Sequence, residues 1–186
     1  MKPSDIEQTI DYKELRQTLL SSKNQTELYD KIVNAPFKYQ VGMTFMFLGI
    51  IAFLLVDKKT KTINRLAYSK TDLSEDVSKV SSLPFNEIKI SLDDSDNLIA
   101  KAINSNQIQS TTDWKDLLMP ALSQEQAQIN QAAGGIAFTA VYPFKSLAGG
   151  AITFNYFQYE EEIGELQTDF MRRYTEIVDD VLKNFK

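Results

Sequence analysis

Two apolar runs in the C-terminal half of the chain alternate as β-strands do. In residues 136–142, every second side chain would share one face of a sheet, namely Ile136, Phe138, Ala140 and Tyr142. Residues 151–157 form the second run. Pro143 cannot donate to a strand ladder, and Gly149 and Gly150 permit the positive φ angles of a tight loop. The pattern predicts a β-hairpin across residues 136–157.

A second apolar segment, residues 39–56, contains no charged residue over eighteen positions. This length reaches the lower limit for a transmembrane helix, and Lys58 and Lys59 would suit a cytoplasmic flank. A strand over residues 49–56 would be equally apolar throughout if helices covered both faces of its sheet. The polar turn at residues 57–62 and the mixed run at 63–68 favour the strand. We therefore expect a central strand, with a membrane segment as the alternative.

Capping patterns predict helices at both ends of the chain. Ser4 with Glu7 and Asn24 with Glu27 each match a capping box, and Pro36 would end the second helix. Residues 160–185 read as one long amphipathic helix with apolar residues three or four positions apart. This stripe can pack on its own sheet, pair with a second copy of the chain, or do both. We predict a dimer interface at Ile163, Leu166, Phe170, Tyr174, Ile177 and Val181.

Shorter elements occupy the middle of the chain. Residues 85–92 and 108–111 predict strands, and the acidic cluster at residues 93–96 is expected to cap a helix over 97–105. The cluster does not match a calcium-binding loop, so no metal site is predicted. Ser123 with Gln126 begins another helix, which ends at Gly134 and Gly135. Together these helices and strands predict an α+β fold.

The residue types that the chain lacks exclude more functions than its average composition does. At 186 residues, 43% of them hydrophobic and 24% charged, the chain suits one globular domain, and a net charge of -5 provides no basic excess for a nucleic acid. The chain contains neither cysteine nor histidine, which removes thiolate, disulfide and imidazole chemistry. The remaining reactive side chains match no catalytic motif. We expect a protein that is not an enzyme, has no cofactor and, given its polar N-terminus, is cytoplasmic.

The order of these elements resembles that of a GAF domain. The segments that carry the resemblance are residues 49–57, 97–109, 135–144 and 149–154. It covers about residues 28–185, and we expect residues 25–186 to form the domain and residues 1–24 an N-terminal helical extension. The resemblance implies a profilin-like architecture with a central antiparallel sheet of five to six strands, the N- and C-terminal helices on one face of the sheet and a ligand pocket on the other. It also implies a small-molecule sensor or a dimerisation module.

Several known activities of that family do not fit this sequence. Bilin attachment and free methionine sulfoxide reduction need cysteine, haem binding needs histidine, and the signature of cyclic-nucleotide binders is not apparent. A ligand would be held by hydrogen bonds and apolar contacts alone. The candidate ligand-binding residues are Asp113, Trp114, Thr139, Asn155 and Tyr156, although Asp113 also suits a helix cap and Trp114 a core position.

The sequence therefore predicts a non-enzymatic, GAF-like sensory or regulatory domain. We expect it to bind a small molecule or a protein partner and to signal through its terminal helices, as a homodimer. The alternative is a structural protein that dimerises through these helices and is associated with a membrane through residues 39–56.

Overall fold

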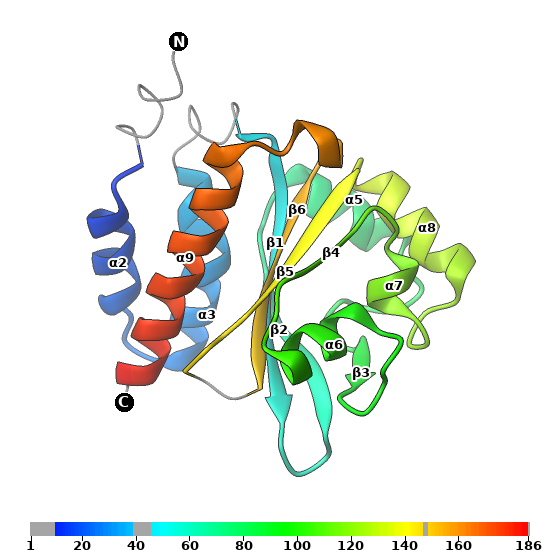
Figure 1. Ribbon diagram of the computed structural model, residues 1–186, viewed down its shortest axis with the longest axis horizontal. Helices are drawn as coiled ribbons and strands as arrows, with labels where there is room; N and C mark the ends of the chain where they lie inside the picture. Colours follow the sequence, from blue (N-terminus) through cyan, green and yellow to red (C-terminus); the bar gives the residue numbers. More distant parts are fainter. Residues whose placement is uncertain (1–9, 39–45, 147–148, 186) are drawn as a thin grey trace.

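The computed structural model describes residues 10–38, 46–146 and 149–185 and shows a six-stranded antiparallel sheet between two layers of helices (Figure 1). The strand order is β3-β2-β1-β6-β5-β4. Along the chain the elements are α2 (Tyr12–Leu20), α3 (Gln25–Asn34), η1 (Ala35–Lys38), β1 (Leu48–Asp57), β2 (Thr62–Tyr68), α5 (Asp72–Val80), β3 (Lys89–Ser91), α6 (Leu98–Ser105), β4 (Gln109–Thr111), α7 (Lys115–Leu118), α8 (Gln124–Ala133), β5 (Phe138–Pro143), β6 (Gly150–Tyr156), η2 (Glu160–Glu162) and α9 (Glu165–Asn184). The predicted α+β class is confirmed.

β1 lies inside the sheet, paired with β2 on one side and β6 on the other. Its residues are buried from Leu48 to Leu54 because helices cover both faces, which explains the continuous apolar pattern. Ile51 and Phe53 belong to one core and Ile50 and Ala52 to the other. The predicted central strand is therefore confirmed. No helix among the described residues is long and apolar enough to cross a membrane, and residues 39–45 lie outside the described part of the chain.

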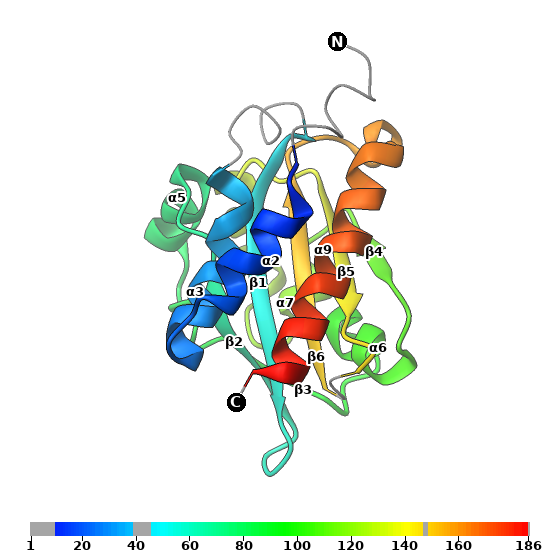
Figure 2. The same cartoon turned by 90° about the vertical axis from the view of Figure 1, so that its left-hand side faces the viewer.

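α2, α3 and α9 cover one face of the sheet and bury its most aromatic surface (Figure 2). The Phe154 ring on β6 makes edge contacts with Phe170 and Tyr174 on α9, at centroid distances of 6.0 and 6.5 Å. The Tyr174 hydroxyl donates to the carbonyl oxygen of Ile32 on α3 at 2.6 Å. Leu15 on α2 lies in the same core. This face, called the helical face below, is closed by three helices.

α5, α6, α7 and α8 cover the opposite face, called the pocket face below (Figure 1). Asn97 begins α6: its Oδ1 accepts from the backbone N–H of Ile99 at 2.9 Å, and its Nδ2 donates to the carbonyl oxygens of Leu117 and Met119. The amide thus caps one helix and fixes the end of α7 beside it. The predicted cap at residues 93–96 was one residue too early, because an amide both donates and accepts where a carboxylate only accepts.

Three predicted elements differ from the structure by two or more residues at a boundary. Only Lys89–Ser91 of the expected strand over residues 85–92 pairs with β2, because a turn closed by the backbone hydrogen bond from Glu87 to Pro84 directs Phe85 inward. The long C-terminal helix begins at Glu165, after the short η2 and Gly164. The hairpin strand begins at Phe138 and not at residue 136.

The helix starts and the hairpin follow local sequence chemistry. Asn24 caps α3 by accepting from the backbone N–H of Glu27 at 2.9 Å, as predicted. α2 begins at Asp11, and the proposed box at Ser4 and Glu7 lies outside the described residues. Gly149 has a φ of 98°, in the left-handed region that favours glycine, at the return of the β5–β6 hairpin.

Candidate functional site

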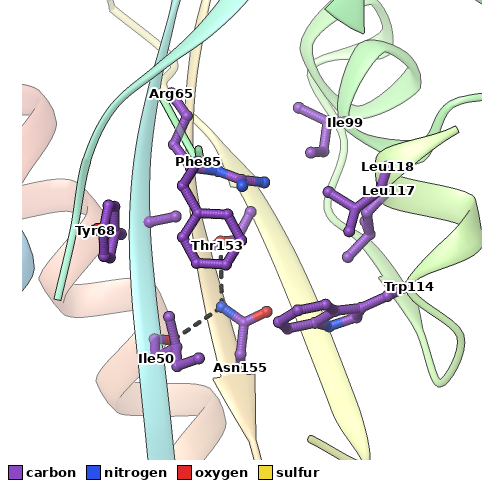
Figure 3. A pocket seen from close by; sticks show the side chains of 11 residues that line it. Ile50, Arg65, Tyr68, Phe85, Ile99, Trp114, Leu117, Leu118, Thr153 and Asn155 are labelled. Atoms are coloured by element: carbon purple, nitrogen blue, oxygen red, sulfur yellow. Dashed lines mark hydrogen bonds between the residues drawn. The ribbon is translucent and has the colours of Figure 1, made fainter. Parts of the chain in front are cut away.

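A pocket lies on the pocket face between the sheet and the α6–α7 segment (Figure 3). β1, β2 and β6 supply its floor, and Ile99, Leu117 and Leu118 face them from the helices. Phe85, on the turn after α5, closes one side. The enclosed space is about 20 Å³, which holds about one water molecule. The pocket is therefore in the expected place but is nearly filled by side chains.

A chain of hydrogen bonds crosses this face. The indole Nε1 of Trp114 donates to Thr139 Oγ1 at 3.0 Å, and Thr139 Oγ1 donates to Asn155 Oδ1 at 2.9 Å. Asn155 Nδ2 donates to the carbonyl oxygen of Ile50 at 2.9 Å and to Thr153 Oγ1 at 3.3 Å (Figure 3). All four polar side chains are buried. Burial without partners would cost free energy, so this network fixes the orientation of each group.

Strand pairing explains why these residues meet. Thr139 on β5 is directly opposite Asn155 on β6, so their side chains lie on the same side of the sheet. Thr153 is two residues before Asn155 and shares that side. Trp114 precedes α7, where its backbone N–H donates to Gln131 Oε1 at 2.9 Å. Two strands and one helix–helix contact thus place the network.

The predicted ligand-binding residues separate into two groups. Trp114 and Asn155 line the pocket, and Thr139 joins them. Asp113 lies just before α7 and accepts from the backbone N–H of Lys115, the first residue of that helix, at 2.9 Å. Tyr156 points to the helical face, where burial raises the pKa of its hydroxyl and no partner for that hydroxyl occurs among the described residues.

The predicted dimer-interface residues lie on α9 and the segment before it. Phe170, Tyr174 and Val181 are fully buried in the core of their own chain. Ile163, Leu166 and Ile177 are partly buried against the same core. Much of the apolar stripe therefore packs on its own sheet.

Arg65 on β2 lines the pocket but was not predicted as a site residue. Its guanidinium lies over the Phe85 ring at 4.9 Å from the centroid, and Figure 3 shows it directed into the pocket. Its Nε is buried and has no hydrogen-bond partner in the part of the chain that is described. Burial lowers the pKa of the Arg65 guanidinium to about 10, so the group remains charged at neutral pH.

A β-bulge directs Arg65 to the pocket. Leu54 on β1 is opposite Arg65 and Phe53 is opposite Ala67, which leaves Leu66 without a partner. Because of this extra residue, Arg65 and Tyr68 reach the same face although they are three positions apart. Strict alternation along β2 would place Arg65 and Tyr68 on opposite faces of the sheet.

The same two residues also line a wider groove at the edge of the sheet. This groove has a volume of about 480 Å³ and is bordered by Tyr29 and Asp30 on α3 and by Lys70. β3 pairs with Thr62–Asn64 of β2, and no strand in the described part of the chain covers the edge beyond residue 64. Arg65 and Tyr68 thus separate the enclosed pocket from an open groove of ligand size. No metal-binding group of acidic side chains occurs in residues 10–38, 46–146 or 149–185.

Comparison with protein-family models and with curated protein sequences gives no match. Solved structures do match. The GAF domain of an Acinetobacter phosphoenolpyruvate-protein phosphotransferase has a TM-score of 0.62 at 12% identity, covering 99% of this chain and 95% of that one. The free methionine-R-sulfoxide reductase of Neisseria meningitidis, solved with its substrate, has a TM-score of 0.62 at 10% identity, with 98% and 91% covered.

A third similar structure is the GAF domain of a two-component sensor histidine kinase from Bacillus halodurans. Its TM-score is 0.53 at 15% identity, covering 78% of this chain and 88% of that one. These likenesses show that the chain has a GAF-like fold. Since the similar structures include both a sensor domain and an enzyme, the fold alone does not separate the two functions.

Proposed function

We propose that this protein is a sensory or regulatory domain that binds a small molecule in the pocket beside Trp114 and is not an enzyme. The observation that carries the proposal is the buried network from Trp114 through Thr139 to Asn155, which meets an otherwise apolar pocket. A few fixed polar groups among apolar ones are typical of ligand sites. Two structures with this fold support the proposal. The GAF domain of the sensor kinase supports a sensory role, and the substrate-bound reductase supports the binding of a small molecule.

Strand β6 offers a direct route from the pocket to the terminal helices. Its alternate residues Thr153 and Asn155 face the pocket, while Phe154 between them packs on Phe170 and Tyr174 of α9. A ligand that shifts β6 must therefore change the packing of α9, because close-packed interiors transmit small displacements. This is the basis for proposing that the signal leaves through the terminal helices.

A ligand larger than water requires a side chain of the pocket to move. Phe85 is the side chain that we propose moves, because it lies on a turn and not on a strand of the sheet. Its ring makes an edge contact with Tyr68 at a centroid distance of 5.0 Å. Its outward rotation would join the enclosed pocket to the groove that Tyr68 also lines.

Native mass spectrometry of protein purified from its source tests this proposal. We expect a small molecule to be retained by the wild-type protein and lost from Ala52→Leu, which fills the pocket floor. Ala140→Leu is the matched control because Ala140 is equally buried but lies on the helical face. A wild-type protein without a bound molecule, or equal retention by Ala52→Leu, would contradict the proposal.

Pairing of two copies and a cytoplasmic location stay predictions. Within the stripe, the residues that remain available for pairing are Ile163, Leu166 and Ile177, which are partly exposed. We propose that any dimer forms through these three positions and the neighbouring surface of α2.

A further inference from the structure

The pocket contains a half-buried cation, Arg65, whose Nε is fully buried and which has no counter-ion among the described residues. The chain has four arginines, and the three others each pair with a carboxylate: Arg16 with Asp180, and Arg172 and Arg173 with Asp169. Those three side chains are all 44–51% exposed. Arg65 is the most enclosed of the four, and it has neither an ion pair nor a hydrogen bond within the described ranges. Arg65 is therefore the arginine whose charge is least solvated, and it is also the arginine that has no ion pair.

Two hydrogen-bond donors of the pocket have no acceptor among the described residues. Asn155 Nδ2 is engaged by two acceptors, and Trp114 Nε1 by one. The Thr153 hydroxyl accepts from Asn155, but its own O–H has no acceptor in the described part of the chain. The Nε–H of Arg65 likewise has no acceptor, and neither Asp nor Glu is among the described residues that line the pocket. A site with spare donors and a positive charge selects a ligand with negatively charged acceptor oxygens.

Contact with Phe85 does not replace such a ligand. The ring face attracts the guanidinium, but it offers the N–H groups no lone pair of ordinary hydrogen-bond strength. Loss of solvation at Arg65 is therefore only partly offset within the chain.

The pocket also limits the charge and shape of the anion. Arg65 is the sole cation among its lining residues. Lys70 is the next cation in the groove outside, where it pairs with Asp30 at 2.5 Å. One guanidinium balances one carboxylate, whereas a phosphate dianion would keep a charge unbalanced among apolar side chains.

We infer that the ligand of this pocket is a small carboxylic acid with an apolar body. Its carboxylate pairs with Arg65 and accepts from the Thr153 hydroxyl, and its body contacts Ile99, Leu117 and Leu118. The inference rests on the proposed function, because it assigns a chemical class to the molecule that the same pocket binds.

Trp114 provides the readout, because it is the only tryptophan of the chain and lines the pocket. Its fluorescence would be titrated at constant ionic strength with acetate, isobutyrate, benzoate and 3-phenylpropionate, with the amide of each acid, and with inorganic phosphate. We expect at least one carboxylate to bind to the wild type, with Kd weaker by about 30-fold or more for its amide and for Arg65→Met. Arg65→Lys should be intermediate, since it keeps the charge but loses the planar fork.

The outcomes separate the inference from the proposed function. Equal binding of an acid and its amide, unchanged binding by Arg65→Met, or binding of phosphate alone would overturn the carboxylate inference and leave the pocket a ligand site. When no compound of the series binds, the mass of the molecule retained in native mass spectrometry decides. A retained acid that Arg65→Met loses supports the inference, a retained neutral molecule overturns it, and no retained molecule overturns both proposals.

A second measurement needs no ligand. Removing a partly buried charge that has no counter-ion should stabilise the ligand-free protein, so Arg65→Met is expected to raise Tm by roughly 2–8 °C. Arg172→Met is the control, because Arg172 is exposed and paired, and its Tm should stay within about 2 °C of wild type. A lower Tm for Arg65→Met would show that contacts within the chain already satisfy the guanidinium, and would overturn the inference.

Discussion

The two faces of the sheet share the same strands but are filled by different kinds of side chain. Along β6, Phe154 and Tyr156 point to the helical face, and Thr153 and Asn155 point to the pocket face. On the helical face, rings pack on rings and three helices close the core. On the pocket face, the equivalent positions hold hydrogen-bonding groups beside the half-buried cation Arg65.

This difference indicates that the two faces of the sheet contribute differently to stability and to binding. Apolar packing on the helical face contributes stability that does not depend on any ligand. We expect the polar groups of the pocket face to contribute less, and the unpaired Arg65 to lower stability. Groups that lower the stability of a protein are typical of functional sites, where they are retained because they bind a ligand. The comparison can be tested by changing one face at a time.

The largest effect is expected on the helical face. Phe154→Ala should lower the free energy of unfolding by about 3–5 kcal/mol, because Phe154 is fully buried between Tyr142, Phe170 and Tyr174. Urea unfolding followed by far-UV circular dichroism measures the change. Leu66→Ala is the control, since Leu66 is 44% exposed, and it should change stability by about 0.5 kcal/mol or less. Comparable losses from both variants would contradict the assignment of the main core.

On the pocket face, Thr139→Val should cost about 1–3 kcal/mol. The replacement keeps the shape of the side chain but removes the hydroxyl that links Trp114 to Asn155, so both partners lose a hydrogen bond in a buried place. A shift of Trp114 fluorescence should accompany the loss. Thr175→Val is a matched control, because the Thr175 hydroxyl bonds only to the backbone one helical turn earlier. An unchanged stability of Thr139→Val would show that the network does not hold the pocket together.

The loss of folding stability at high pH depends on a buried tyrosine of the helical face. Burial raises the pKa of the Tyr174 hydroxyl above its ordinary value of 10.0. In the unfolded chain Tyr174 ionises near pH 10 while the folded protein keeps it neutral, so stability is intact below pH 10 and falls as the pH rises further. Between pH 9.5 and 11, wild type should lose about 1 kcal/mol more than Tyr174→Phe.

Urea unfolding at the two pH values measures this difference. Tyr159→Phe is the control because Tyr159 is 64% exposed, and it should show the wild-type loss. Identical losses for wild type and Tyr174→Phe would mean that the folded protein exposes this hydroxyl to solvent at high pH.

Most of the fold could be predicted from the sequence because its signals are local. The continuous apolar residues of β1, the cap at Asn24 and the glycine at the hairpin return each follow from the chemistry of a few neighbouring residues. The prediction of a strand over residues 85–92 was wrong in part, because the turn after Pro84 is favoured over strand pairing there. Local alternation cannot show which strand residues find a partner.

The candidate site was harder to predict. Trp114, Thr139 and Asn155 were found as polar or aromatic groups in apolar surroundings, and the structure links them. Asn155 and Tyr156 were grouped together although neighbouring residues of a strand point to opposite faces, a rule already available from the sequence. Arg65 could not be found in that way, because its direction depends on the bulge at Leu66.

The smallest effect on stability is expected where the helical face meets solvent. Ile177 is partly buried beside a shallow groove between α2 and α9, so Ile177→Glu should cost about 1 kcal/mol or less. Its effect on assembly should be larger, because a carboxylate in an apolar contact between copies would prevent pairing. In sedimentation velocity at micromolar concentration, we expect a dimer for wild type and for the exposed control Lys183→Glu, and a monomer for Ile177→Glu. A wild-type monomer would leave the apolar stripe of α9 explained by its own sheet alone, and the terminal helices would then have to signal to a different protein.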